Sequence, residues 1–149
     1  MAVVSQPGRA LGVDLGSVRI GLALSDPTRT VASPYDVAQR GPNHAADHRA
    51  ILDVARANGV TTIVVGLPRS LSGAMGPAAR AADKEIAELR DAAGADIDVV
   101  AHDERLTTVT AERALDEARV DRRTRKAVVD KVAAAVMLQS WLESRVSAR

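Results

Sequence analysis

Three acidic residues lie where a charged side chain is costly to bury. Asp14 interrupts the apolar run at residues 11–15, which otherwise has the character of a buried strand. Glu104 follows closely after a second apolar run, at residues 97–101, and Asp130 lies in a segment that is apolar on almost every side. An isolated carboxylate in such surroundings is strongly destabilising unless a partner neutralises it. Each of the three acids therefore needs a counter-charge.

A single metal site would explain all three carboxylates. Like-charge repulsion makes such a cluster unstable by itself, and a divalent cation removes that conflict. Oxygen ligands, with no cysteine and few histidines in the chain, favour Mg²⁺ or Mn²⁺ over Zn²⁺. Two such ions, about 4 Å apart, suit the in-line displacement at a phosphodiester. The pattern predicts a hydrolase in which Asp14, Glu104 and Asp130 are the catalytic metal ligands.

Each acid also has a purely structural explanation, which the sequence leaves open. Asp14 is also compatible with an ion pair to Arg19 across a hairpin, or with a hydrogen bond to an amide of the glycine turn that follows it. Glu104 is placed to stabilise the N-terminus of a helix that begins shortly after it. Asp130 has lysines nearby with which it could form a salt bridge.

Two polar segments have the composition of phosphate-binding sites. The loop at residues 66–73 follows a predicted strand and contains Arg69 and Ser70. The densest basic cluster spans residues 119–126, and its candidate phosphate-binding residues are Arg122, Arg123 and Arg125. The net charge of the chain is only +1, so it provides little overall attraction for nucleic acid. Beside a carboxylate–metal site, these local groups would supply the contacts to phosphate. Taken alone, the first segment fits a plain connecting loop equally well. A charge run such as the second is more often a solvated face.

The other acids have the pattern of solvated helix faces, and the histidines do not form a recognisable ligand set. Acids at exposed-face spacing on predicted helices are Glu85, Glu88, Asp91, Glu112, Asp116, Glu117 and Glu143. The histidines, which are His44, His48 and His102, show no ligand-like spacing. His102 is near the predicted site, either as a supporting residue or as a polar group at the end of a strand.

Hydrophobic periodicity places these residues on an α/β framework. Short apolar or alternating runs predict strands at residues 11–15, 19–25, 31–37, 61–65 and 97–101. Apolar residues three or four apart predict helices at 43–58 and 77–94, a third near 107, and a last one that ends at about 145. The first three strands are expected to be antiparallel, and the two strands after helical crossovers parallel to the first. This order predicts a mixed five-stranded sheet with helices on both faces.

The composition limits the class of protein. A chain of 149 residues suits one domain, predicted at 10–146 after a flexible arm at 1–9. Without cysteine there is no disulfide framework and no thiolate metal site. No apolar run approaches the roughly 20 residues of a membrane span, and the start lacks the pattern of a secretory signal. We therefore expect a cytoplasmic protein with no membrane partner. One Trp, one Tyr and no Phe argue against nucleic-acid binding by stacked aromatic rows.

Four segments together resemble the YqgF-type, RuvX-like family of Holliday-junction-resolvase-like proteins, also described as pre-16S ribosomal RNA nucleases. The segments are GVDLGSVRIGLALSD, VVGLP, DERLTT and DKVAAAVMLQSWL, in this order over residues 11–142. The resemblance implies a ribonuclease H-like fold and a metal-dependent phosphodiesterase. It also implies that the motif acids, at Asp14, Glu104 and Asp130, are the metal ligands.

The same resemblance implies roles for polar residues of the motifs. Arg19 matches the arginine of the first hairpin. Arg105, Thr107 and Thr108 match polar positions of the third segment, where they would orient Glu104 or contact the substrate. No motif acid is replaced, so the sequence gives no sign of lost catalysis.

The leading hypothesis is an endonuclease that acts on structured RNA and processes the 5′ end of precursor 16S ribosomal RNA, with Mg²⁺ or Mn²⁺ as cofactor. One alternative is a junction resolvase that cuts branched DNA, which needs two active sites and hence a homodimer. Another is an RNA-binding ribosome-assembly factor with weak catalysis. The first hairpin also resembles the phosphate loop of actin-like ATPases, but those proteins need two such domains and this chain has room for one.

Overall fold

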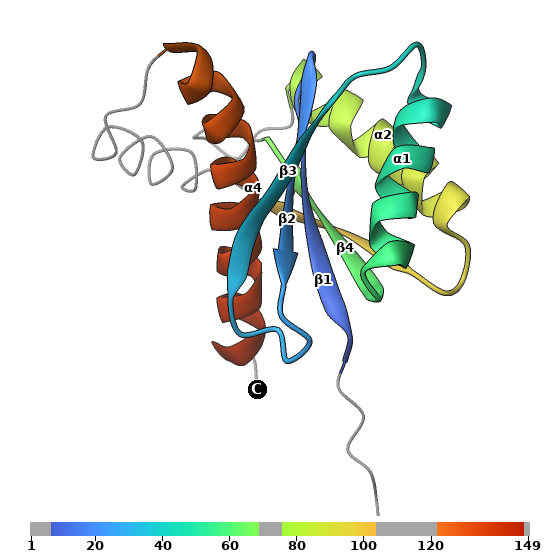
Figure 1. The fold of residues 1–149 in the computed structure, drawn as a ribbon. Helices are drawn as coiled ribbons and strands as arrows, with labels where there is room; N and C mark the ends of the chain where they lie inside the picture. Colours follow the sequence, from blue (N-terminus) through green and yellow to red (C-terminus); the bar gives the residue numbers. More distant parts are fainter. Residues whose placement is uncertain (1–6, 69–75, 104–121, 148–149) are drawn as a thin grey trace, which may run out of the picture.

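The computed structural model describes residues 7–68, 76–103 and 122–147, which form a five-stranded sheet with helices on both faces (Figure 1). The strands are β1 (Arg9–Leu15), β2 (Arg19–Ser25), β3 (Ala32–Gln39), β4 (Val60–Leu67) and β5 (Asp98–Asp103), and the helices are α1 (His44–Ala57), α2 (Pro77–Ala93) and α4 (Arg122–Ser147). The strand order is β3-β2-β1-β4-β5. β1, β2 and β3 are antiparallel neighbours, whereas β4 is parallel to β1 and β5 to β4.

The predicted mixed sheet is therefore confirmed. Each observed strand and helix begins and ends within about two residues of its predicted range, as expected for boundaries read from periodicity. The helix predicted near residue 107 lies outside the described residues. Most of the predicted arm at 1–9 also lies outside them, while the carbonyl oxygen of Gly8 accepts a 2.9 Å hydrogen bond from Arg29 Nε.

The helix ends follow from local sequence. Asn43 precedes α1 and its side-chain oxygen accepts a 2.8 Å hydrogen bond from the Ala46 amide, which satisfies one free donor of the first turn. α2 opens at Pro77, whose fixed φ suits the first helical position and which has no amide proton to satisfy. These caps fix where α1 and α2 start, and hence which of their residues face each other.

A tight turn joins β1 to β2 and sets their register. Leu15 pairs with Ile20 and Asp14 pairs with Gly21 across the hairpin. A Cβ atom at Gly16 would lie 2.4 Å from the Arg19 carbonyl oxygen, so this position of the turn admits only glycine. The turn thereby fixes the end of β1, including Asp14.

The two faces of the sheet carry separate apolar cores. The core beneath α1 and α2 contains large buried side chains such as Leu11, Val13, Ile51, Ile63, Val65, Ile86 and Leu89. The core beneath α4 is built from Ala10, Ala23, Val64, Ala134, Ala135, Met137, Leu138, Trp141 and Leu142. Small residues on this second face allow α4 to approach closely: a Cβ atom at Gly12 would lie 2.9 Å from Leu138 Cβ and 3.0 Å from the Ala134 oxygen.

Among the helices of the described ranges, none combines the length and the apolar character that a membrane span requires.

Candidate active site

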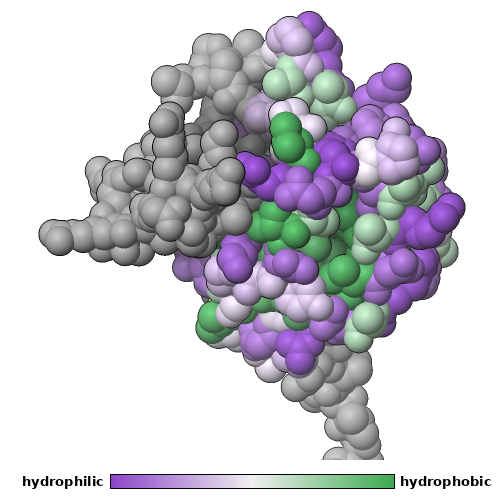
Figure 2. Space-filling model, turned by 45° about the horizontal axis from the view of Figure 1, so that its top comes forward, coloured by the Kyte–Doolittle hydropathy of each residue, from purple (hydrophilic) through white to green (hydrophobic). Residues whose placement is uncertain are grey.

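The carboxyl ends of three strands meet at one edge of the sheet, toward the top of Figure 1. β1 reaches this edge at Asp14 and Leu15, β4 at Leu67 and β5 at Asp103. Ligands of open α/β sheets bind outside the carboxyl ends of the strands. Figure 2 views the molecule with this top turned forward, where most of the visible described surface is hydrophilic and apolar residues lie largely in the gaps between polar ones.

Asp14 lies on the face of the sheet that α4 covers. Residues alternate between faces along a strand, and Ala10 and Gly12, four and two residues before Asp14, both pack on the α4 side. The next strands place glycines beside it, because Asp14 pairs with Gly21 and because Gly66 follows Val65, the partner of Val13. The half-buried Asp14 carboxylate therefore has no side chain at either neighbouring strand position.

The backbone of α4 runs antiparallel to β1. Ala134 and Leu138 lie over Gly12, in the middle of β1. Trp141, further along the helix, is contacted by the Arg29 guanidinium, and Arg29 also binds the Gly8 carbonyl just before β1 begins. Later residues of α4 therefore lie near the start of β1. Figure 1 shows the same opposed directions.

This direction relates Asp130 to Asp14. The four residues from Ala134 back to Asp130 advance about 6 Å along the helix axis. The two residues from Gly12 to Asp14 advance about 7 Å along the strand, toward the same end of the sheet. Asp130 is thus a residue of α4 on the helical turn that precedes the Gly12 contact, at the level where β1 carries Asp14.

The other predicted site residues are placed only in part. Arg19 is the first residue of β2, next to the turn that follows Asp14. Three of the predicted phosphate-binding residues fall in the first turn of α4, namely Arg122, Arg123 and Arg125. Six predicted residues lie outside the described ranges: Arg69, Ser70, Glu104, Arg105, Thr107 and Thr108.

His102 joins this edge to α4. It lies on β5 beside Gly66, and its Nε2 is 3.0 Å from the Ser140 hydroxyl of α4. Burial lowers the pKa of His102, and the nearby Asp103 opposes that shift. The sequence left two roles open for His102, a supporting residue of the site or a polar group at the end of a strand. The contact with Ser140 favours the second role, in which His102 links β5 to α4.

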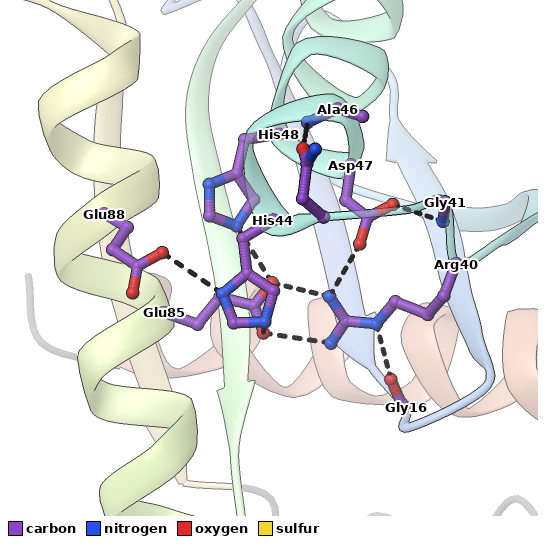
Figure 3. Close-up of polar contacts among 10 residues, drawn as sticks. Gly16, Arg40, Gly41, His44, Ala46, Asp47, His48, Glu85 and Glu88 are labelled. Atoms are coloured by element: carbon purple, nitrogen blue, oxygen red, sulfur yellow. Dashed lines mark hydrogen bonds and ion pairs between the residues drawn. The ribbon is translucent and has the colours of Figure 1, made fainter.

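A second polar cluster lies on the opposite face of the sheet, between α1 and α2 (Figure 3). The Arg40 guanidinium binds both oxygens of Glu85, with Nη1–Oε2 at 2.6 Å and Nη2–Oε1 at 2.9 Å. Arg40 also donates to Asp47 Oδ2 at 3.1 Å and, through Nε, to the Gly16 carbonyl at 2.9 Å. His48 Nε2 lies 2.9 Å from Glu85 Oε2. The β1–β2 turn is therefore held from α1 and α2 through one arginine.

This cluster corrects two predictions. Glu85 is only 5% exposed, not a solvated helix residue, because its position between Ala82 and Leu89 lies within the buried stripe of α2. His44 and His48, which showed no ligand-like spacing, do bring ring nitrogens close to a carboxylate. The available signal was their separation of four residues on a predicted helix, which places both on one face.

Burial raises the pKa of the Glu85 carboxyl, but hydrogen bonds from Arg40 and His48 and the charge of Arg40 outweigh it, and the net pKa is lowered. The same partnership raises the pKa of Arg40. Glu85 and Arg40 are thus both held in their charged forms.

A cavity of about 540 Å³ opens beside this cluster, next to the β1–β2 turn. Its lining includes Gly16 and Ser17 of the turn, Pro68 after β4, and Arg40 and His44. It lies near the carboxyl ends of β1 and β4, but it is lined from the α1 and α2 side rather than from the α4 side. The cavity and Asp14 therefore lie near the same end of the sheet but on opposite faces of it.

Solved structures support the fold class. The structure of "T. thermophilus RuvC in complex with Holliday junction substrate" matches with a TM-score of 0.53 and 18% identity, covering 93% of this chain and 95% of that one. A second structure of Thermus thermophilus RuvC matches with a TM-score of 0.54 and 14% identity, covering 93% and 96%. The mixed sheet flanked by helices is a ribonuclease H-like fold, as predicted.

Sequence comparison gives the family. A model described as "RuvX: Holliday junction resolvase" matches residues 8–144. A protein of Roseiflexus sp. (strain RS-1) is 43% identical over 141 residues, covering 95% of this chain and 98% of the relative. One of Kineococcus radiotolerans is 46% identical over 140 residues, covering 93% and 73%. Both are named "Putative pre-16S rRNA nuclease". The chain belongs to the RuvX family, which confirms the resemblance found in its motifs.

Proposed function

We propose that this protein is a metal-dependent endonuclease that hydrolyses phosphodiester bonds of structured RNA. Membership of the RuvX family and relatives that carry the name of a nuclease support this function. The observation that carries it is Asp14, a half-buried carboxylate at the carboxyl edge of the central strand, with glycines at the adjacent strand positions. The glycines at these positions leave space beside Asp14 in which an ion could be bound.

Asp14, Glu104 and Asp130 are the residues that would hold Mg²⁺ or Mn²⁺. Three carboxylates form a donor set of hard oxygens, which suits these ions better than Zn²⁺. Asp14 fits this role because its strand ends at an edge that the N-terminal half of α4 also approaches. When bound, the ion would polarise the scissile phosphate and offset its developing negative charge.

The protein's own residues would bind and orient the nucleic acid. Arg19 follows the turn after Asp14, and the arginines of the first turn of α4 are placed on the helix that also contains Asp130. Arginines bind phosphate oxygens through paired N–H groups, so they would fix the backbone relative to the carboxylates. We assign substrate contacts to Arg19, Arg69, Ser70, Arg105, Thr107, Thr108, Arg122, Arg123 and Arg125.

The proposed substrate is precursor 16S ribosomal RNA, as the names of the relatives suggest. Cleavage at its 5′ end and a cytoplasmic location are further parts of this proposal. The second candidate is branched DNA, because the matching family model is described as a Holliday junction resolvase. Symmetric cutting of a junction needs two active sites, so the second candidate requires a homodimer. The first does not.

The test compares purified wild type with D14N on a precursor 16S RNA fragment and on a synthetic four-way DNA junction, with Mn²⁺ present. Asp36 on β3 is exposed, so D36N is the matched control. We expect wild type and D36N to cut the RNA, and D14N to give no product while keeping its thermal unfolding midpoint. Equal cleavage by D14N would overturn the mechanism. Cleavage of the junction alone would select the resolvase, and tight RNA binding without product would select an assembly factor.

A further inference from the structure

The cluster between α1 and α2 has the arrangement of a second metal site, of a different chemical class. His44 and His48 lie one turn apart on α1, and Glu85 faces them from α2 (Figure 3). One ligand atom from each of the three residues lies within 4.8 Å of the others. His48 and Glu85 are buried, at 3% and 5% exposure, whereas the His44 side chain is 54% exposed. We propose that His44, His48 and Glu85 bind a transition-metal dication of the Zn²⁺ class.

The donor set points to this class of ion. Two imidazole nitrogens and one carboxylate suit Zn²⁺, whereas Mg²⁺ prefers oxygen ligands alone. Bonds of about 2.0–2.2 Å in a tetrahedral site separate ligand atoms by about 3.3 Å. His48 Nε2 and Glu85 Oε2 are 2.9 Å apart, and His44 Nε2 and Glu85 Oε1 are 3.9 Å apart. These two distances end on different oxygens of Glu85, and one ligand atom from each of the three residues lies within 4.8 Å of the other two. Rotation of the exposed His44 side chain would shorten these separations toward the required value.

Glu88 orients the exposed ligand. Its Oε2 lies 3.1 Å from His44 Nδ1, so a proton on Nδ1 is donated to the carboxylate and the lone pair of Nε2 is directed away from it. A carboxylate behind a ligating histidine is the usual arrangement in zinc sites, where it fixes the tautomer. Glu88 thus acts as a positioning residue for His44.

Arg40 sets an upper limit on the affinity. Its guanidinium occupies one acceptor position on each Glu85 oxygen. A carboxylate offers about four acceptor positions, so one remains on Oε2, where His48 now binds. The ion would displace the hydrogen bond between His48 and Glu85, and the neutral imidazole would bind it through Nε2 in the tautomer that carries its proton on Nδ1. The positive charge of Arg40 opposes the ion, so replacing Arg40 strengthens binding.

The ion can reach these ligands from solvent. The cavity of about 540 Å³ is lined by His44 and Glu85. A second cavity of about 440 Å³, between α1 and α2, is lined by His48 and Glu88. The cluster lies between the two, and an ion bound there would cross-link α1 to α2. Because it lies on the α1 and α2 side of the sheet, this site is independent of Asp14.

The test titrates ZnCl₂ into the EDTA-treated, desalted full chain by calorimetry, with Co²⁺ absorption as a spectroscopic measure of four-coordination. The background is D14N, which removes a ligand of the proposed catalytic site. We expect one Zn²⁺ per chain, a raised unfolding midpoint, and a visible Co²⁺ band. H44A should weaken binding at least about tenfold, and E88Q by about 10–100-fold. The matched control is H102N, which removes the histidine outside the cluster and should bind normally.

The outcomes separate cleanly. His44 is exposed, so H44A folds even if changes at the buried His48 do not, and its midpoint without metal verifies this. Absence of zinc binding in the D14N background, or equal binding by H44A, would overturn the proposal. Loss of cleavage in D14N together with retained zinc binding would support both sites independently. Tighter binding by R40M would confirm that the ion shares Glu85 with Arg40.

Discussion

Arg40 and Glu85 form a two-contact ion pair that links the end of β3 to the middle of α2, with N–O distances of 2.6 and 2.9 Å. The side chains are 17% and 6% exposed, so each charge depends on the other for solvation. Removing one partner of a buried pair leaves an uncompensated charge and costs about 3–5 kcal/mol. We expect R40M to lower the free energy of unfolding by about this amount, measured by urea denaturation without added metal.

The control for this change is R49M. Arg49 lies on the same helix as Asp47 but is exposed, so its replacement should alter stability by less than about 0.5 kcal/mol. Equal stability of R40M and R49M would show that the pair contributes nothing net to the fold.

The lowered pKa of Glu85 predicts a loss of stability in acid. Its ordinary value is 4.5, and the folded protein holds it lower because Arg40 and His48 outweigh the effect of burial. Below about pH 4.5 the unfolded chain therefore binds more protons than the folded one, so stability falls as pH falls toward the lowered pKa. Above pH 4.5 the contribution is fully present.

Urea unfolding between pH 3.5 and 6, in EDTA, measures this slope. E85Q should be less stable than wild type at pH 6 and should lose less stability on acidification. The exposed Glu143 provides the control, because E143Q should keep the wild-type slope. Other titratable residues lie in the same cluster, namely His44, Asp47, His48 and Glu88. The contribution of Glu85 is therefore taken from the difference between the pH dependences of E85Q and E143Q, and not from either curve alone. Parallel curves for E85Q and wild type would rule out the assignment.

Gly12 allows α4 to pack closely on β1. An added methyl group would meet Leu138 Cβ at 2.9 Å and the Ala134 oxygen at 3.0 Å, so G12A must displace the helix. Overpacking of this kind costs about 1–3 kcal/mol. G76A provides the comparison, because among the described residues other than its chain neighbours no atom lies within 4 Å of a Cβ at Gly76. Thermal unfolding of G12A at the wild-type midpoint would contradict the close contact.

Ser25 satisfies a buried backbone amide at the opposite end of β1. Its Oγ accepts a 2.8 Å hydrogen bond from the Ala10 amide and donates to the Asp26 carbonyl at 2.9 Å. S25A leaves the amide without a partner, which costs about 1–3 kcal/mol. Ser33 on β3 is exposed, and S33A should be neutral in the same chemical denaturation experiment. A neutral S25A would mean that water replaces the hydroxyl.

The fold was predictable because its signals are local. Alternation in β2, the β-branched residues of β4 and the Asn43 and Pro77 starts of the helices each determine an element within a few residues. Strand order then follows from the short β1–β2 connection and from the helical crossovers that β4 and β5 require. Asp14 stands out for a related reason: a charge within an apolar strand is visible without knowing what surrounds it.

The Arg40–Glu85 cluster could not be predicted in the same way. Its members come from the end of β3, from α1 and from α2, and only the packing of α1 against α2 brings them together. Each one taken alone is an ordinary polar residue near a helix face. The prediction that Glu85 lies on an exposed helix face is wrong because helical periodicity separates residues by hydropathy alone. It cannot identify a charged residue that is buried together with an oppositely charged partner.

The central claim is that Asp14, Glu104 and Asp130 bind one or two divalent ions at the carboxyl edge of the sheet. A crystal structure of the protein soaked in MnCl₂, with anomalous diffraction recorded at the manganese edge, tests it most directly. The account predicts an anomalous peak within bonding distance of an Asp14 oxygen, about 2.1–2.3 Å, with Glu104 and Asp130 in the same coordination sphere. Carboxylates too far apart to share an ion, or each paired with its own arginine or lysine, would contradict it.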